Sequence, residues 1–467
     1  MSMRVRWLLL LMLGPGACTT GTNGPPPPPP PRQPVDMTLP SAPDRNADPR
    51  ILEIELEAGE ATKQYGDAPA TNVWAYNGSV PGPLLDVAVG DRLIIHFTNH
   101  LPEETTIHWH GVRVPATMDG TLAMQSPIPS GGTFTYDFVA RDAGLFWYHP
   151  HMRSDIQVQK GLYGAIRVRG PDEPTVDQEL ILMLDDIRLR PDGTLNEYLD
   201  DNGLMLGREG NTLLVNGVVS PLIALTPGAL VRLRVVNVAN GRFFNLRLDG
   251  LSWRVIGGDG GLLPESLDAE HVLLSPGERA DLVFVAPTTV GMELPVVSDP
   301  YERGHGTSAH GALEVARFQV QDGTALSGRV LPAVQNTVEL LPDGENAFTI
   351  TLDEGIRDGQ TIFTVNGETY PDVPAISVVN GTVAAFDVRN TSEMDHPFHL
   401  HGFFFQVLAS NGVAIPPERR ANKDTIIVPA ESTLHLVSRL DEPGSWMYHC
   451  HILEHAEAGM MGELRVE

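Results

Sequence analysis

Three residues near the end of the chain, Cys450, His455 and Met460, follow one another at intervals of five residues. A thiolate, imidazole rings and a weak axial thioether together form the ligand set of a blue electron-transfer copper. His396, in an earlier segment, can supply the second imidazole. An isolated cysteine is usually a buried, inert thiol, but a cysteine at this spacing from a histidine and a methionine predicts a copper site.

Two histidines, His449 and His451, flank the cysteine. If this segment is a β-strand, their side chains point to the opposite face from Cys450, because side chains alternate along a strand. They therefore cannot bind the same copper as the cysteine. The same two-residue spacing occurs four times in all: His108 with His110, His149 with His151, His399 with His401, and His449 with His451. One such pair is usually a solvated or core couple, but four pairs predict a cluster of several copper ions, since imidazole is a preferred copper ligand.

These motifs resemble those of the multicopper oxidases, the family that includes laccases, bilirubin oxidase and bacterial cuprous oxidases. The four motifs stand in the family's order: HWHG at 108–111, WYHPH at 147–151, HPFHLHG at 396–402 and HCHILEHAEAGM at 449–460. The resemblance implies a copper-dependent oxidoreductase that takes single electrons from a donor and reduces dioxygen to water. It also implies cupredoxin-like Greek-key domains.

The resemblance further implies which residues hold each of four copper ions. The type 1 copper, where electrons enter, would be bound by His396, Cys450 and His455, with Met460 in the axial position. The other three ions would be held as follows: type 2 by His108 and His399, one type 3 copper by His110, His149 and His451, and the other by His151, His401 and His449.

Asp119 stands where the family places a carboxylate that assists proton transfer near the copper cluster, although a surface turn is the alternative interpretation. Many bacterial relatives carry a second carboxylate, a glutamate directly after the last histidine. Here that position is Ala456, so the second proton donor stays open between Glu454 and Glu457.

The opening residues 1–18 have the features of an export signal: two arginines, an apolar run at 7–13 that is too short to span a bilayer, and small residues before Cys18. Cys18 also resembles the lipidated cysteine of a lipoprotein, although Pro15 departs from the usual aliphatic residue. Lipid anchoring and soluble secretion therefore both stay open. We predict an exported protein of the periplasm or cell envelope.

Residues 19–48 contain few apolar side chains and a proline run at 25–31, which predicts a disordered, extended linker. Folded structure is expected to begin near Ile51. From there the chain shows short alternating segments rich in Val, Ile, Thr and Phe, separated by Gly and Pro, and no long amphipathic helix. This pattern predicts an all-β protein.

One unit recurs three times in the chain: an Asn-Gly pair, then a glycine, then an alternating segment that ends in asparagine nine residues after that glycine. The copies are Asn77-Gly78 with Gly90 and Asn99, Asn216-Gly217 with Gly228 and Asn237, and Asn366-Gly367 with Gly381 and Asn390. Their intervals of 139 and 150 residues are domain-sized. We predict three β-sandwich domains at 49–170, 171–331 and 332–467. Because the paired histidines occur only in the first and third copies, the cluster should lie between those domains, with the second as a spacer.

The formal net charge of -27 disfavours nucleic acid and anionic membranes as partners. The two cysteines, Cys18 and Cys450, are assigned to processing and to copper, so we expect no internal disulfide. We also expect a monomer.

An axial methionine favours easily oxidised donors, such as small phenolic or aromatic compounds and reduced metal ions. The 14 methionines are scattered along the chain, so a laccase-like oxidase is preferred over a cuprous oxidase. The alternative is a nonenzymatic copper-binding or assembly protein on the same fold. A two-domain copper nitrite reductase is disfavoured by the histidines on both sides of Cys450. The loop 301–310 carries His305 and His310 and could bind a further metal ion, although a solvated loop is the simpler interpretation.

Overall fold

The computed structural model describes residues 33–195, 201–307, 310–334, 336–344 and 347–467. The predicted export signal at 1–18, the proposed lipid anchor at Cys18 and the proline run at 25–31 lie outside these residues and stay predictions. Within the described ranges, no helix is both long enough and apolar enough to cross a membrane.

Residues 34–48 were assigned to the disordered linker, and this part of the prediction does not hold. Met37 and Leu39 are buried, and the backbone N–H of Val35 donates to the carbonyl oxygen of Leu222 at 2.8 Å. Apolar residues at alternate positions allow this short segment to cover part of the folded body even though its neighbours are polar.

The predicted all-β class is confirmed, since six sheets make up nearly all of the regular structure. In the first β-sandwich, the sheets have the strand orders β2-β1-β4-β6 and β3-β8-β7-β5, and one apolar core contains side chains from both. The first strand begins at Ile51, as predicted. The strands are β1 (Ile51–Lys63), β2 (Thr71–Tyr76), β3 (Leu85–Ala88), β4 (Arg92–Asn99), β5 (His108–His110), β6 (Thr133–Val139), β7 (Gly144–His149) and β8 (Gly164–Arg169).

The second sandwich pairs a seven-stranded sheet, β11-β10-β9-β13-β18-β15-β16, with a five-stranded sheet, β12-β20-β19-β14-β17. Its core again draws on both sheets. The strands are β9 (Gln178–Ile187), β10 (Thr212–Val215), β11 (Val218–Val219), β12 (Leu222–Leu225), β13 (Leu230–Asn237), β14 (Phe244–Leu248), β15 (Trp253–Gly258), β16 (Gly261–Ala269), β17 (His271–Leu274), β18 (Arg279–Val285), β19 (Glu293–Asp299) and β20 (Leu313–Val320).

The third sandwich pairs β22-β21-β24-β29-β26-β27 with β23-β31-β30-β25-β28, and its core contains Cys450 and Met460. Its strands are β21 (Ala347–Arg357), β22 (Gln360–Val365), β23 (Ile376–Val378), β24 (Thr382–Asn390), β25 (His396–Leu400), β26 (Phe405–Ser410), β27 (Val413–Ala414), β28 (Thr425–Val428), β29 (Thr433–Leu440), β30 (Gly444–Cys450) and β31 (Met461–Val466). Short helices complete the fold: α1 (Ser154–Gln159), α2 (Asp201–Leu206), α3 (Leu453–Glu457) and the 3₁₀ turns η1 (Ala116–Met118) and η2 (Pro417–Arg419).

The repeated Asn-Gly pair makes the same turn in each sandwich. Asn77 adopts a left-handed backbone conformation, accepts a hydrogen bond from the backbone N–H of Glu57 and donates one to the carbonyl of Glu55. Asn216 and Asn366 make the equivalent pair of bonds to β9 and β21. Since β1, β9 and β21 each pair in parallel with the strand that ends in the second asparagine, the three sequence copies are three copies of one structural unit.

The second asparagine of each copy fixes the loop that follows its strand. Asn390, at the end of β24, donates to the carbonyls of Met394 and Val428 and accepts from the N–H of Ser392. Asn99 and Asn237 make the same three kinds of bond at the ends of β4 and β13. In the first and third sandwiches, the loops held in this way lead into β5 and β25, which carry the first histidines of the copper motifs.

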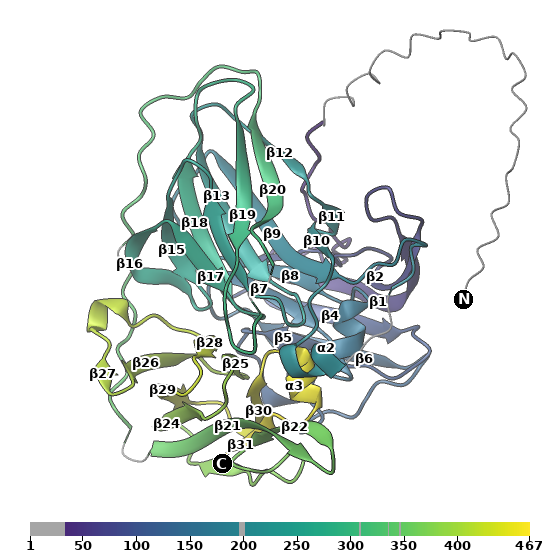
Figure 1. Cartoon of the computed structure of the whole chain (residues 1–467), viewed down its shortest axis with the longest axis vertical. Helices are drawn as coiled ribbons and strands as arrows, with labels where there is room; N and C mark the ends of the chain where they lie inside the picture. The colour runs from purple at the N-terminus through teal and green to yellow at the C-terminus, as the bar shows by residue number, and fades with distance from the viewer. Residues whose placement is uncertain (1–32, 196–200, 308–309, 335, 345–346) are drawn as a thin grey trace, which may run out of the picture. The chain divides into compact units, whose positions relative to one another are not determined.

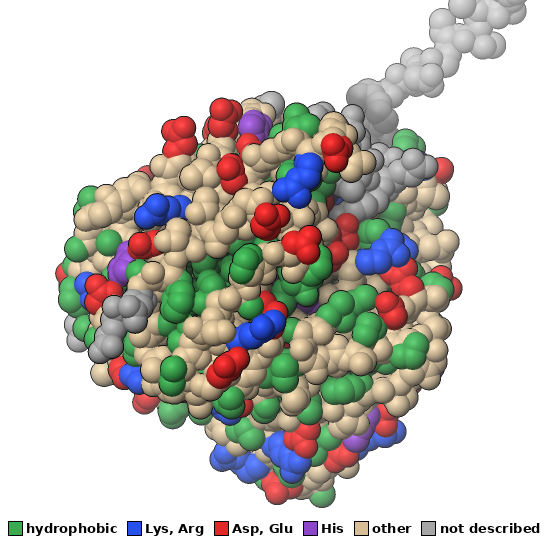
Figure 2. All heavy atoms as spheres, turned by 90° about the horizontal axis from the view of Figure 1, so that it is seen from below, with side chains coloured by type: hydrophobic (Ala, Val, Ile, Leu, Met, Phe, Trp, Pro, Cys, Tyr) green, Lys and Arg blue, Asp and Glu red, His purple; other side chains and the backbone are tan. Residues whose placement is uncertain are grey.

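Charged side chains of both signs are dispersed on the face shown in Figure 2, among hydrophobic and neutral polar ones. On that face no extended patch of one sign is visible, as expected from a sequence without runs of like charge.

Candidate metal centres

One candidate centre lies inside the third sandwich, where His396 of β25, Cys450 of β30 and His455 of α3 meet. The sulfur of Cys450 lies 3.6 Å from Nδ1 of His396 and 3.8 Å from Nδ1 of His455, and the two Nδ1 atoms are 3.3 Å apart. All three residues are 0% exposed. The remaining ring nitrogens are occupied, because Nε2 of His396 contacts the hydroxyl of Ser392 at 2.9 Å and Nε2 of His455 contacts the carbonyl oxygen of Met205 at 3.2 Å.

The local fold explains this convergence. Strands β25 and β30 are antiparallel neighbours, with Phe398 opposite Cys450. The chain then turns through α3, which returns His455 to the sulfur. The carbonyl of Met460 accepts a hydrogen bond from the N–H of Cys450, and Met460 is buried in the same core. Phe363 stacks on the His455 ring, with the ring centroids 3.8 Å apart.

A second candidate centre lies between the first and third sandwiches and contains all eight paired histidines. Strand pairing sets His108 opposite His149 and His399 opposite His449. The potential ligand atoms lie within 4.8 Å of one another inside each of three sets: His108, His110 and His399; His110, His149 and His451; and His151, His401 and His449. The second and third sets are the two predicted type 3 groups, and the first contains the predicted type 2 pair. In Figure 1, β5 of the first sandwich lies next to β25 and β28 of the third, at this junction.

The orientation of most of these rings is fixed by bonds at Nδ1. In five of the eight, Nδ1 faces an oxygen atom: His108 with the Asp119 carbonyl at 3.0 Å, His149 with the Pro150 carbonyl at 2.8 Å, His399 with the Asp424 carbonyl at 2.9 Å, His401 with the Asp119 carboxylate at 2.9 Å, and His449 with the Cys450 carbonyl at 2.8 Å. These oxygens accept the ring proton, so the Nε2 lone pairs are left for a metal ion.

The chemistry of the second centre fits copper. Several ring nitrogens are buried and have no hydrogen-bond partner: Nε2 of His108, His149 and His399, Nδ1 of His110, and both nitrogens of His451. Buried polar atoms normally have partners, and a Lewis acid would satisfy these. Burial, reinforced by neighbouring imidazoles, holds the pKa of His110, His149 and His399 far below its ordinary value. The rings are therefore neutral and able to donate electron pairs.

Comparison with known proteins agrees with this geometry. Three models of the multicopper oxidase family match residues 57–173, 181–316 and 339–467. The multicopper oxidase MmcO of Mycobacterium tuberculosis is 31% identical over 432 residues, which cover 85% of this chain and 83% of the relative. The chain belongs to the multicopper oxidases. Members of this family bind copper and are oxidoreductases that use dioxygen and reduced substrates such as phenolics or metal ions.

Other relatives of this multicopper oxidase carry different functional names. A laccase of Bacillus subtilis is 27% identical over 484 residues, covering 87% of this chain and 93% of the relative. A solved multicopper oxidase from Campylobacter jejuni, described as a metallo-oxidase, has a TM-score of 0.82 and 32% identity and covers 93% of this chain and 96% of the relative. The names do not decide between organic and metal donors.

Asp119 of this multicopper oxidase is fully buried, so the alternative of a surface turn is wrong. Its carboxylate contacts Nδ1 of His401 at 2.9 Å and lies 3.3 Å from Nδ1 of His108. Gly120 allows this placement, since its backbone is left-handed and a Cβ there would overlap the carbonyl of Ile107.

The two glutamates near Ala456 occupy different surroundings. Glu454 is buried and accepts a hydrogen bond from the side-chain amide of Asn240 at 2.8 Å. Glu457 accepts from the N–H of Ser154 at 2.8 Å. It also lines a cavity of about 240 Å³ that reaches His151 of the cluster.

The histidines of the loop 301–310 have ordinary partners. His305 contacts the Glu354 carboxylate at 2.7 Å, and Nδ1 of His310 contacts the Gly311 carbonyl at 2.9 Å. Among the described residues, neither histidine belongs to a group that could hold a metal ion.

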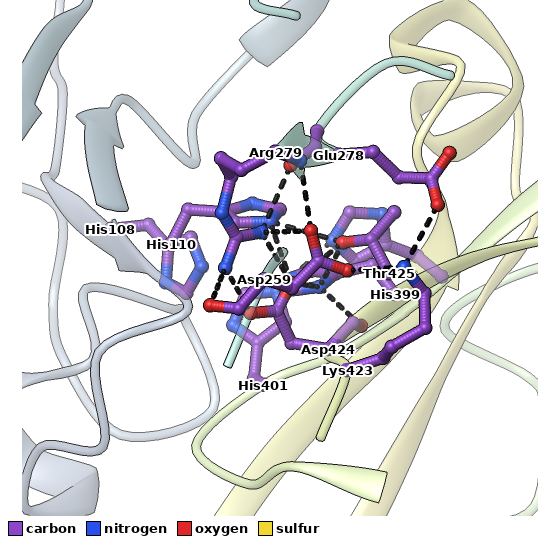
Figure 3. Close-up of polar contacts among 12 residues, drawn as sticks. His108, His110, Asp259, Glu278, Arg279, His399, His401, Lys423, Asp424 and Thr425 are labelled. Atoms are coloured by element: carbon purple, nitrogen blue, oxygen red, sulfur yellow. Dashed lines mark hydrogen bonds and ion pairs between the residues drawn. The ribbon is translucent and has the colours of Figure 1, made fainter. Parts of the chain in front are cut away.

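His110 differs from the five rings described above, because its Nε2 is the bonded nitrogen (Figure 3). It lies 3.2 Å from Oδ1 of Asp424 and 3.1 Å from the hydroxyl of Thr425. That hydroxyl donates its proton to Asp424 at 2.9 Å, so both neighbours of Nε2 act as acceptors. Nε2 must therefore carry the ring proton, and Nδ1 presents the lone pair.

Asp424 belongs to a buried ionic network that the sequence did not reveal. Arg279 makes a two-pronged ion pair with Asp424, with 2.6 Å between Nη1 and Oδ1. Lys423 lies 2.9 Å from Asp259 and 3.1 Å from Glu278. Burial lowers the pKa of Lys423, but these two carboxylates outweigh burial and raise it above its ordinary value. No motif marks these residues, and a single Asp or Arg does not stand out among 59 acidic and 32 basic residues.

Proposed function

We propose that this multicopper oxidase takes single electrons from a donor at a type 1 site formed by His396, Cys450 and His455, and that it reduces dioxygen to water at the eight-histidine cluster. The observation that carries the proposal is the position of Cys450. Its sulfur faces two imidazole nitrogens, while its chain neighbours His449 and His451 belong to the two type 3 sets. One tripeptide thus joins the two centres.

The proposed ligands follow the sets of side chains that lie together. Met460, buried in the same core as Cys450, would supply a further, weaker ligand to the type 1 ion. The other ions would be held by His108 and His399; by His110, His149 and His451; and by His151, His401 and His449. Copper bound there would supply storage for four electrons, which allows a one-electron donor to drive a four-electron reduction.

The protein prepares the type 1 site by burial. Burial raises the pKa of the Cys450 thiol above its ordinary value, so the metal-free residue keeps its proton. Copper binding must displace this proton, as is usual for thiolate ligands. The N–H of Ile452 points to the sulfur at 3.4 Å and would help to stabilise the thiolate.

Asp119 is the group best placed to hold a proton beside the cluster, because it links His401 and His108 from a buried position. The cavity lined by Thr121, His151 and Glu457 gives a route from this region toward solvent. We propose that protons reach the cluster along this side.

The residues that cover the type 1 site favour small donors. The sequence favoured a laccase-like oxidase over a metal oxidase, and we propose the opposite order. Neither type 1 imidazole is exposed, and helix α2 places the carbonyl of Met205 against Nε2 of His455. No donor can touch either ring directly, so electrons must pass through the covering residues, and a small ion can approach that cover more closely than a bulky phenol. We therefore propose reduced metal ions as preferred donors and place bulky aromatic compounds second.

The test is to load the protein with copper, count the ions per chain, record the visible thiolate band expected for a blue site, and measure oxygen uptake. Copper(I), iron(II) and a bulky phenolic dye would be compared as donors by kcat/KM. Faster oxidation of the dye would overturn the donor preference and leave the oxidase intact. Bound copper without oxygen uptake from any donor would overturn the oxidase and favour the copper-binding or assembly alternative.

A further inference from the structure

We infer that Arg279 of the second sandwich is a positioning residue for the copper cluster, because it holds Asp424 where that carboxylate fixes the ring of His110. The inference rests on the proposed function, since it assigns His110 to copper. It also gives the second sandwich a role beyond the spacer that the sequence suggested.

Arg279 contacts all three sandwiches from a buried position. Its guanidinium donates to the carbonyl of Leu145 in β7 at 3.2 Å, to the carbonyls of Asp259 at 2.9 Å and Gly277 at 3.0 Å, and to the carboxylate of Asp424. Its exposed fraction is 2%. A planar guanidinium presents five donors in a fixed fork, whereas a lysine ammonium cannot satisfy these separate acceptors at once.

Three donors set where the Asp424 carboxylate can lie. The carboxylate receives Arg279 from the second sandwich, the hydroxyl of Thr425 from its own, and Nε2 of His110 from the first. The backbone of Gly111 packs closely against the pair, since a Cβ on Gly111 would come within 2.5 Å of Arg279 and 2.6 Å of Asp424. The ion pair therefore lies directly against the chain that carries His110.

These contacts decide which ring nitrogen His110 presents to the copper cluster. His110 turns Nδ1 toward the cluster only while acceptors hold its Nε2–H. Loss of Arg279 would leave Asp424 as a buried carboxylate without its cation, which is strongly unfavourable, and the carboxylate would move or draw in water. The His110 ring would then lose the partner that fixes its tautomer and its direction.

Three variants test this assignment. Arg279→Gln and Asp424→Asn each remove one side of the pair. Asp281→Asn is the matched control, because Asp281 is also a buried carboxylate paired with arginine, here Arg232. Within the part of the chain that the structure describes, Asp281 makes no hydrogen bond or ion pair to a histidine. All three are expected to lower stability.

The decisive readouts are copper retention against a chelator and the EPR and near-ultraviolet spectra of the cluster. Removing partners that orient metal ligands typically costs about 10–100-fold in metal affinity. We expect a loss of that size at the cluster in R279Q and D424N, with the blue type 1 band per chain unchanged. D281N should keep wild-type affinity and spectra. Wild-type copper retention and spectra in R279Q and D424N would overturn the inference.

Arg279→Lys provides a second route if the first two variants do not fold. It keeps the charge and loses the fork, so a smaller loss of cluster affinity is expected, and an unchanged affinity would also overturn the inference. Failure of the proposed function is distinguishable, because it would show in the copper-loaded wild type as an absence of oxygen uptake, whatever the variants retain.

Discussion

Gly277 allows a close approach of the second sandwich to the copper cluster, and Gly277→Ala should damage that cluster specifically. A Cβ at this position would lie 2.9 Å from Cδ2 of His451 and 3.0 Å from Cε1 of His110. The backbone there has φ = +87°, a conformation that side chains other than glycine adopt at a cost. Two separate penalties therefore act on the variant.

The size of each penalty can be worked out. A left-handed backbone costs alanine about 1–2 kcal/mol, and overpacking a tight site by one methyl group costs roughly 1–3 kcal/mol more. We expect G277A to lose about 2–5 kcal/mol of unfolding free energy by these two effects. To reach ordinary van der Waals contact, the imidazole rings must shift by roughly half an ångström, which is the tolerance within which site residues need to be held.

Gly250→Ala is the matched control. Its backbone has a similar φ of +82°, and nothing lies within 4 Å of the added methyl group. It should lose only the backbone part, about 1–2 kcal/mol, and keep full activity. Denaturant unfolding of the copper-free variants measures the first effect. Oxygen uptake of the copper-loaded variants measures the second, and we expect it to fall about 10–100-fold in G277A, as when partners of metal ligands are lost. If the two variants unfold alike and G277A keeps wild-type turnover, the rings do not lie where the structure places them.

Three further predictions concern other parts of the molecule. Cys450→Ser should abolish the blue band and turnover while circular dichroism stays unchanged; turnover without the thiol would remove Cys450 from the electron path. Asp119→Asn should slow oxygen uptake per bound copper and retain the blue type 1 band, and unchanged uptake per bound copper would exclude Asp119 from proton delivery. Burial raises the pKa of Asp185 from 3.8 to about 7, so the contribution of Asp185 to the free energy of unfolding should fall by about 4 kcal/mol as pH rises from about 4 to 7. In copper-free protein, Asp185→Asn should therefore gain stability relative to wild type between pH 5 and pH 8, and a constant difference in unfolding free energy would contradict this.

The sequence was informative wherever a pattern is local or repeated. The spacing of Cys450 from its neighbours and the four histidine pairs predicted both centres, since metal ligands must be of a few residue types. The three Asn-Gly units predicted three sandwiches, and the structure shows why they recur: each asparagine makes the same pair of bonds to the first strand of its sandwich, β1, β9 or β21.

The ionic network could not be found in this way. Arg279 and Asp424 are 145 positions apart, and ion pairs between distant segments leave no periodic signal. The preferred nitrogen of His110 was equally hidden, because it depends on acceptors from β28 and the residue before it. Met205 covers His455 with its backbone carbonyl. Because this contact does not depend on the Met205 side chain, no residue type in the sequence indicates it.

The ring nitrogens without a protein partner explain why contacts from all three sandwiches meet beside the copper cluster. The six ring nitrogens without a protein partner do not themselves hold the cluster together. The ligands therefore need contacts that do not involve metal, and the guanidinium of Arg279, which binds acceptors in all three sandwiches, makes such contacts. Copper then satisfies the nitrogens, and because it binds only the assembled cluster, its binding energy stabilises the assembly of the sandwiches as well.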